Sequence, residues 1–409
     1  MANPLKIAVR KFAPFESAVQ KIWENFRRET NTTLQMEMVS LELHDLYHST
    51  VKEGGLKSGE WDLAIINTDW IHEAYETGGV EDLTPYLNRK SPESYPEGWC
   101  QSLLELQQFD GAVTGLPFHD GPECLIYRKD LFNDKKEQEN FYKTHKKPLQ
   151  PPQTWEDFVR IAEFFQRPAE GLYGTVFAGF PDGHNTVFDF SLQLWTRGGE
   201  LTDSNGKVQI NTEAACQGLE FYRKIFNNDK AIHPGSRKLD SVKAGEAFAR
   251  GEIAMMVNWF GFASVCEVSD QSMVKGKVDI THLPKDQNAS TASLNVYYLY
   301  VMAAGSTQKQ AAYDFLKYAV NARNDKLLTL EGGIGCRLST WKDPEVNAVI
   351  PYYHKLEALH HNARALPQKS NWAEIAAVID DVVLQAVNTE RSVGGILQEG
   401  QQKLELQDK

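Results

Sequence analysis

The sequence contains few cysteines, and their positions do not form a framework. Five of the 409 residues are cysteines, no two have CxxC spacing, and an odd number cannot all pair within one chain. A disulfide framework and a zinc site are therefore not expected. Small buried side chains are predicted at these positions, which are Cys100, Cys124, Cys216, Cys266 and Cys336.

Long apolar runs are also missing. No window approaches about 18 uninterrupted apolar residues, so no membrane-spanning helix is expected. The opening residues, MANPLKIAVRKF, contain neither the apolar core nor the cleavage site of a secretory leader. From the residues alone two interpretations stay open: a cytosolic protein, which the free thiols mildly favour, or an exported protein whose leader has been removed.

An excess of basic residues is absent as well. The formal net charge is −12, which argues against a nucleic-acid-binding surface, because such a surface needs clustered Lys and Arg. The short basic runs Lys135-Lys136 and Lys146-Lys147 are interleaved with Glu and are predicted to be solvated faces.

Several common site motifs do not occur. There is no GxxxxGK[ST], GxSxG or HExxH, and no GxGxxG opens a helix after a strand. Dinucleotide, P-loop, α/β-hydrolase and zincin interpretations therefore lack support. His360 and His361 are adjacent on a predicted helix and cannot face one metal ion together.

What the sequence does contain is enough apolar material for two cores. The chain is 42% apolar and rich in aromatic residues, which suits two domains and an aromatic-lined binding site. Apolar periodicity predicts strands at 5–9, 32–41 and 62–67, alternating with helices at 15–30, at 43–61 and from about 69. This alternation predicts an α/β layer around a mainly parallel sheet.

The second half is predicted to be mostly helical. Between 133 and 153 the chain is charged and then proline-rich, and the prolines exclude a regular element there. Later strands are predicted at 206–211, 251–259 and 295–303, and helices at 155–165, 188–201, 212–226, 241–251, 308–320 and from 372 to the end. Strand-rich material that returns near 295–303 suggests that the chain crosses between domains more than once.

Seven segments in order carry a resemblance to a known family. They are WDLAIINTDWIHEAYETGGVEDLTPYL, GLPFHDGPECLIYRKDLF, PPQTWEDFVRIA, LWTRGGELTDSNGKVQINTEAACQGLEFYRKIF, AFARGEIAMMVNW, AAYDFLKYAV and GGIGCRLSTWKDPEV. In this order the chain resembles the extracellular solute-binding proteins of ABC transporters, in particular the large sugar-binding family that includes maltose-binding protein. Two departures occur: Cys336 stands where the family usually has Pro, and LNVYYLYVM replaces the family's LGGWxLAI pattern.

The resemblance implies a fold and a set of partners. It implies a two-lobed periplasmic-binding-protein fold (type II), with mixed, mostly parallel sheets flanked by helices and a hinge between the lobes. Residues 1–120 and 298–337 are expected in the N-terminal lobe and 124–295 and 340–409 in the C-terminal lobe, with crossovers near 121–123, 296–297 and 338–339. It also implies a monomer outside the cytoplasm, in the periplasm or as a cell-surface lipoprotein, that meets ABC permease subunits, carries no cofactor or metal and has no catalytic residue.

Carbohydrate recognition needs groups for the hydroxyl edge and aromatic rings for the C–H face of a sugar. From that chemistry and the resemblance together, residues at strand ends and crossovers are the candidates. They are Arg10, Phe12, Asn67, Asp69, Trp70, His119, Asp120, Glu123, Asn258, Trp259, Tyr297, Tyr298, Arg337, Asn371 and Trp372.

Each candidate has a plain structural alternative. Trp70 and Trp372 fit a core stripe, and Asp120 before a glycine fits a turn. Glu123 fits a solvent-facing position, and Arg337 fits an ion pair across the lobes. If Arg10 and its neighbour Lys11 line the site, an anionic sugar or sugar acid becomes plausible.

Three competing functions remain beside sugar binding. A relative that binds another solute, such as a sugar acid, phosphate ester, polyamine or peptide, is the nearest. A glycoside hydrolase that uses Asp120 and Glu123 is less favoured, because such carboxylates normally flank the substrate and these lie three apart on one crossover. The third is a scaffold protein that binds a partner through its surface and whose cleft has no function.

Overall fold

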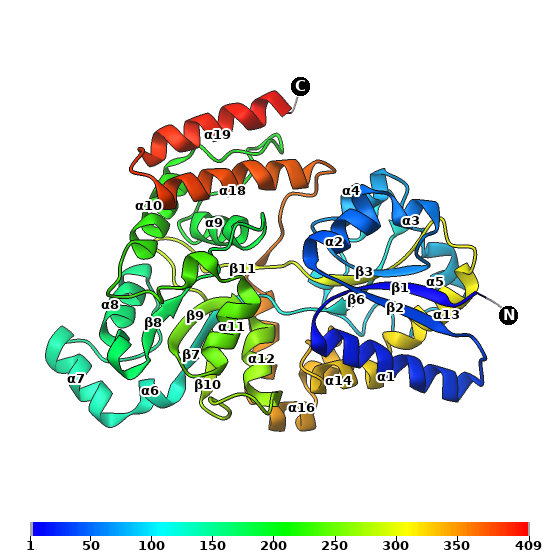
Figure 1. Ribbon diagram of the computed structural model, residues 1–409, viewed down its shortest axis with the longest axis horizontal. Coiled ribbons are helices and arrows are strands. Elements are labelled where there is room, and N and C mark those ends of the chain that lie inside the picture. Colours follow the sequence, from blue (N-terminus) through cyan, green and yellow to red (C-terminus); the bar gives the residue numbers. More distant parts are fainter. Residues whose placement is uncertain (1–2, 408–409) are drawn as a thin grey trace. The chain divides into compact units, whose positions relative to one another are not determined.

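The computed structural model describes residues 3–407, which divide into two compact units. Unit 1 contains residues up to Gly121, Asn295–Leu356 and Gln368–Trp372, and unit 2 contains Pro122–Leu294, Glu357–Pro367 and the residues from Ala373. The chain therefore passes several times from one unit to the other, and each unit is built from segments far apart in the sequence (Figure 1).

Unit 1 is a mixed sheet with helices on both faces; Figure 1 shows α2, α3 and α4 on one side and α1 on the other. The sheet order is β2-β1-β3-β12-β6, and a short hairpin, β4-β5, lies outside it. Its first part consists of β1 (Leu5–Arg10), α1 (Ala13–Thr30), β2 (Met36–Leu41), α2 (Leu43–Tyr47), the π-helical turn η1 (His48–Lys52), α3 (Gly55–Ser58), β3 (Leu63–Asn67), α4 (Ile71–Glu76), α5 (Thr84–Lys90), η2 (Gln101–Leu103), β4 (Gln108–Phe109), β5 (Ala112–Val113) and β6 (Leu116–His119). Its later part consists of β12 (Tyr298–Met302), α13 (Lys309–Ala319), α14 (Ala322–Leu330), α15 (Leu338–Trp341), α16 (Pro344–Val349) and η5 (Tyr353–Lys355).

Unit 2 contains a second mixed sheet of order β10-β7-β9-β8, with a two-stranded ladder β11-β13 beside it. Its elements up to the second crossing are β7 (Glu123–Arg128), α6 (Lys129–Asn133), α7 (Lys135–His145), α8 (Trp155–Phe165), η3 (Pro168–Glu170), β8 (Tyr173–Val176), α9 (Asn185–Trp195), α10 (Glu213–Phe226), η4 (Ser236–Lys238), α11 (Ser241–Ala249), β9 (Ile253–Trp259), α12 (Phe260–Val268), β10 (Val278–Thr281) and β11 (Ser293–Leu294). The chain returns to it through α17 (Leu356–His360), β13 (Ala363–Arg364), α18 (Trp372–Asn388) and α19 (Val393–Gln407).

The apolar pattern explains which surfaces are buried. Strand β3 is buried at all of its residues, as expected for a strand covered on both faces. Helix α1 buries one stripe, whose members recur at three- and four-residue spacing: Phe15, Ala18, Val19, Ile22, Trp23 and Phe26. Helix α9 is buried at all of its residues, as expected for a helix enclosed by its neighbours on every side.

Both sheets are mixed, as the resemblance implied, but parallel pairing does not predominate in either. In unit 1, β1 is parallel to β2 and β3, but β12 is antiparallel to β3 and β6. In the four-stranded sheet of unit 2, β8 and β9 are parallel, but β7 is antiparallel to β9 and to β10. Strand β12 enters unit 1 directly from a crossing and not through a crossover helix, so its direction is not set by a βαβ unit.

Three local predictions were wrong in detail. The charged segment after Asn133 does form a helix, α7, because Asp134 caps it by accepting from the backbone N–H groups of Lys136 and Glu137, and the prolines begin only later. The predicted strand at 206–211 is reduced to one antiparallel bridge between Thr202 and Val208.

The third error is the continuous helix predicted from 372 to the end, which is two helices. Residues 389–392 separate α18 from α19, and Ser392 accepts a hydrogen bond from the N–H of Gly395 at the start of α19.

The third crossing also differs from the predicted one near 338–339. The residues after Arg337 stay in unit 1 as far as Leu356. They are held there by Thr340, whose hydroxyl donates to buried Asp325, and by Trp341, whose indole N–H donates to the carbonyl of Gly335. These contacts join α15 to α14 and to the turn before it.

Candidate functional site

The polar edge of unit 1 lies where the parallel strands β1 and β3 end. Arg10 is the last residue of β1 and Asn67 the last of β3. Because β12 runs in the opposite direction, its first residue, Tyr298, pairs with Asn67 and also with His119 of β6. Strand polarity thus brings four of the predicted residues together.

Hydrogen bonds connect the members of this edge. The side chains of Asn67 and Arg10 bond to the hydroxyl of Tyr298, and the carboxylate of Asp69 acts on it electrostatically. Burial raises the pKa of Tyr298 to about 12, so its hydroxyl stays protonated and available to a partner at neutral pH. Phe15 packs edge-on against Tyr298, His119 and Phe12, and so supports the edge from the core.

His119 is a hydrogen-bonding group here and not an acid or base. Its Nδ1 accepts the backbone N–H of Ile334 at 2.8 Å, which places the ring proton on Nε2. Burial lowers the pKa of His119 to about 3, against a smaller opposing effect of Asp120. The imidazole is therefore neutral at physiological pH, with Nε2–H as a donor.

Asp120, Asp69 and Trp70 lie on the turns that follow the strands. The N–H of Asp120 donates to the carbonyl of Ile334 at 3.0 Å, which ties this residue to the same turn that holds His119. The side chains of Asp69 and Trp70 are buried, and the Trp70 ring lies 5.4 Å from that of Tyr47.

Tyr47 was missed by the sequence reasoning. It is half-buried, and its hydroxyl donates to Glu73 at 2.8 Å. The signal in the sequence that could have found Tyr47 was its position in the predicted helix that follows β2.

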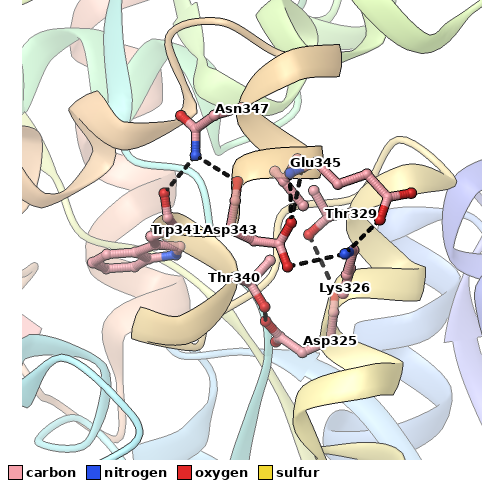
Figure 2. Close-up of polar contacts among 9 residues, drawn as sticks. Asp325, Lys326, Thr329, Thr340, Trp341, Asp343, Glu345 and Asn347 are labelled. Carbon is pink, nitrogen blue, oxygen red and sulfur yellow. Dashed lines mark hydrogen bonds and ion pairs between the residues drawn. The ribbon is translucent and has the colours of Figure 1, made fainter.

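Residues 332–337 are held in place by Asp325. Its carboxylate accepts from the backbone N–H groups of Cys336 and Arg337, at 2.8 and 3.2 Å, and from the Thr340 hydroxyl at 2.5 Å. Figure 2 shows the contact between Asp325 and Thr340. Beside it, Lys326 bonds to Asp343 and Glu345 at 2.9 and 2.8 Å. The network fixes the backbone that in turn binds His119 and Asp120.

Two predicted ligand residues serve the interior of unit 1 instead. The guanidinium of Arg337 donates to the carbonyls of Val320 and Glu93 at 3.0 and 2.9 Å and lies 4.3 Å from the Trp99 ring centre. Tyr297 is buried, and its hydroxyl donates to Gln107 at 2.6 Å. We assign both a structural role, because the two terminal nitrogens of the Arg337 guanidinium and the hydroxyl of Tyr297 already have partners within the unit.

In unit 2, Trp259 ends strand β9 and is half-buried. Its ring packs edge-on against Phe188 of α9, with centroids 5.5 Å apart. In the sheet, Trp259 of β9 is paired with Glu123 of β7. Asn258, predicted to bind ligand, is instead buried and donates its side-chain amide to the carbonyl of Ser241 at 3.0 Å, which anchors β9 to α11. Trp259 is therefore a partly accessible aromatic at the end of β9.

Glu123 does not face solvent. It is 4% exposed, and one carboxylate oxygen has no hydrogen-bond partner among the described residues. Burial and the neighbouring carboxylate of Asp189 raise the pKa of Glu123 well above its ordinary value.

The sequence reasoning missed this acidic cluster, because Asp189 stands in the otherwise apolar run FDFSLQLW. The Tyr222 hydroxyl donates to Asp189 at 2.6 Å. Burial raises the pKa of Asp189 to about 7, and Asp182 adds to that effect. Asp380 of α18, which is bound by the Thr186 hydroxyl, completes the cluster; its pKa is also raised by burial.

Asn371 and Trp372 lie at the start of α18. The Trp372 side chain is buried, and the backbone N–H of Trp372 donates to the carbonyl of Lys369 at 3.1 Å. Their ligand contact stays a prediction. Within residues 3–407, no group of three His, Cys, Asp or Glu side chains is arranged to hold a metal ion, and no helix is long and apolar enough to cross a membrane.

Comparison with known proteins places this architecture. Residues 13–326 match the family described as bacterial extracellular solute-binding protein. A probable ABC transporter-binding protein of Deinococcus radiodurans is 22% identical over 376 residues, which are 90% of this chain and 84% of that protein. A mannitol-binding protein of Pseudomonas aeruginosa is 22% identical over 321 residues, 77% of this chain and 70% of that one.

Solved structures agree on the fold. Maltose-bound MalE3 of T. maritima superposes with a TM-score of 0.86 at 23% identity, covering 99% of this chain and 100% of that one. A solute-binding protein of Agrobacterium radiobacter in complex with ribitol gives 0.87 at 22% identity, with the same coverage. The predicted family and α/β fold class are confirmed, and the chain belongs to the bacterial extracellular solute-binding protein family.

Proposed function

We propose that this protein is the substrate-binding component of an ABC importer and that it captures a neutral carbohydrate or polyol. The observation that carries the proposal is the family match over residues 13–326, together with relatives whose named ligands are mannitol, maltose and ribitol. All three ligands are uncharged and carry many hydroxyl groups.

The chemistry of the two edges supports this choice. In unit 1 the edge offers a neutral imidazole donor at His119, a phenol at Tyr298 and an amide at Asn67, which suit hydroxyl groups. In unit 2 Trp259 offers an aromatic face of the kind that covers sugar C–H groups. Asp69, Asp120, Arg10, Phe12 and Trp70 complete the unit 1 set.

Capture by hinge closure is part of the proposal. Such closure is an established motion of periplasmic binding proteins, and it requires ligand contacts that favour the closed state. The permease subunits of the importer would then recognise the liganded protein outside the cytoplasm. Small-angle scattering should show a smaller radius of gyration with saturating ligand, and an unchanged radius would contradict closure.

Catalysis has no support from the side-chain chemistry. His119 is neutral and engaged through Nδ1, and Asp120 and Glu123 lie three residues apart on one crossing, whereas the two carboxylates of a glycoside hydrolase normally flank the substrate. We therefore expect a bound sugar to be recovered unchanged after prolonged incubation. Sustained sugar release that Asp120→Asn abolishes would restore the hydrolase interpretation.

The test is a thermal-shift screen over sugars, polyols and oligosaccharides, followed by calorimetric titration of each hit. A ligand at about 100 times its dissociation constant adds about 2.7 kcal/mol to stability, which is readily measured. Trp259→Ala should weaken binding at least about tenfold, or about 1.4 kcal/mol, because the sugar loses its aromatic face.

The matched control is Tyr142→Ala on α7, an aromatic that is 57% exposed and lies outside both edges. This variant should bind like the unmodified protein. Failure of every polyhydroxylated compound to stabilise the protein would overturn the proposal.

A further inference from the structure

One carboxylate bridges two cations at the polar edge of unit 1. Glu42 bonds to Arg10 through Oε2 at 2.8 Å and to Lys11 through Oε1 at 3.1 Å. The two oxygens of the carboxylate are therefore directed at the last residue of β1 and at the residue that follows it. We name Arg10, Lys11 and Glu42 the charged corner.

The corner follows from strand pairing. Strands β1 and β2 are parallel and in register, with Arg10 opposite Leu41. Glu42 is the next residue after β2, at the start of α2, and the N–H of Lys11 donates to the carbonyl of Leu41 at 2.7 Å. The two chain ends are thereby held side by side, so Glu42 meets both cations without a long loop.

The corner adjoins the residues proposed to bind ligand. The Arg10 side chain, only 17% exposed, also bonds to the hydroxyl of Tyr298, on which Asp69 acts. Lys11 and Glu42 are 60% and 57% exposed. The formal charges of Arg10 and Lys11 are balanced by those of Glu42 and Asp69, and without Glu42 this group of side chains would carry one net positive charge.

A ligand carboxylate would need the same donors that Glu42 occupies. Guanidinium and ammonium groups are the usual partners of carboxylates and phosphates. Hydrogen bonds from Arg10 and then Lys11 lower the pKa of Glu42, so it is ionised throughout the physiological range and competes as an anion. Ionised Glu42 also repels an incoming anion.

We propose that Glu42 is a specificity-determining residue that makes the site prefer a neutral sugar or polyol over the corresponding sugar acid. It does so by occupying Arg10 and Lys11, whose charges would otherwise favour an anionic ligand. The inference rests on the proposed function and answers the question that Arg10 and Lys11 raise in the sequence.

The experiment compares matched ligand pairs: mannitol with D-mannonate, and maltose with maltobionate. Calorimetry measures the ratio of the acid to the neutral dissociation constant at low salt, for each pair of which a member binds. The unmodified protein should bind the neutral member at least about tenfold more tightly. Glu42→Gln should move the ratio about tenfold toward the acid, or about 1.4 kcal/mol, and added salt should diminish this gain.

Two further variants provide the controls. Glu37→Gln removes a carboxylate of β2, which pairs with Lys6 at 3.9 Å near the end of the strand far from Glu42, and should leave the ratio unchanged. Lys11→Gln added to Glu42→Gln should take back the gain in acid binding. Because Glu42 is exposed, its substitution should fold normally, and a thermal melt checks this.

The outcomes separate the two proposals. Neutral binding with the same ratio in Glu42→Gln and the unmodified protein would overturn the inference alone. Preference of the unmodified protein for the acid would also overturn it, and this result needs no variant. If neither member of any pair binds and the wider screen finds no polyhydroxylated ligand, the proposed function and the inference both fall.

Discussion

Replacing Asp189 by Asn should change how the stability of the protein depends on pH. Asp189 is buried on α9, accepts a hydrogen bond from Tyr222 at 2.6 Å and lies beside Glu123. Burial raises its pKa to about 7, whereas an unfolded Asp has a pKa of about 3.9. The Asn side chain has nearly the same shape, and its oxygen still accepts from Tyr222, but it has no charge to desolvate.

The sign follows from proton binding. Between about pH 4 and pH 7 the native Asp189 keeps a proton that the unfolded chain has released, so the free energy of unfolding falls as the pH rises. The stabilisation is complete below the unfolded pKa and lost as the pH passes the folded one. Each retained proton contributes a slope of about 1.4 kcal/mol per pH unit. From pH 5 to pH 7 this amounts to about 2 kcal/mol.

Urea unfolding at pH 5, 6 and 7 measures the effect. The difference in unfolding free energy between Asp189→Asn and the unmodified protein should shift by about 2 kcal/mol in favour of the variant from pH 5 to pH 7. Asp270→Asn, which removes an exposed carboxylate of the same unit, should show no such shift. A constant difference across the three pH values would refute the reasoning that Asp189 is protonated in the native state.

Two substitutions test the packing of the units by urea unfolding. Asp325→Ala should cost about 3 kcal/mol or more, because it leaves two buried backbone N–H groups without their acceptor; Glu345→Ala, at the exposed end of the same network, should cost about 1 kcal/mol or less. Equal losses of stability in Asp325→Ala and Glu345→Ala would contradict the role of Asp325 as the acceptor that holds this turn. Gly174→Ala should destabilise unit 2 far more than Gly171→Ala, because its Cβ would lie 1.9 Å from the carbonyl oxygen of Ala162, whereas Gly171 has only the strain of φ +72° and open space around it. Similar losses would show that β8 can move away from α8.

Local patterns predicted much of the secondary structure. Helix α8 has the predicted bounds, because its apolar stripe and the Thr154 cap are both local in sequence. Strands β3 and β9 were also located, since buried strands form short apolar runs between turns. The missed helix α7 shows the limit of the same reasoning, because a charged helix with one buried aromatic, Phe141, has little apolar pattern to detect.

The candidate site could be predicted only in part. Arg10 and Asn67 were singled out because they end predicted strands and His119 because it lies on a predicted crossover, and the parallel pairing of β1 and β3 then brings the first two to one edge. The roles of these residues could be assigned only from distances in the structure. A strand end does not reveal that the Nδ1 of His119 is occupied by Ile334, which lies more than two hundred residues later.

The sequence by itself determined the family and the α/β class, because these follow from ordered local segments that short-range chemistry specifies. Tertiary structure alone decided which polar residues are engaged inside a unit. Arg337 and Tyr297 are both polar and stand beside crossings, but long-range contacts with Glu93 and Gln107 bury them. The same holds for the ionisation of two carboxyl groups. That of Glu42 depends on contacts with Arg10 and Lys11, and that of Asp189 depends on burial beside Glu123 and Tyr222. Electrostatic and packing energies depend on distances in space, and the order of the residues alone does not specify these distances.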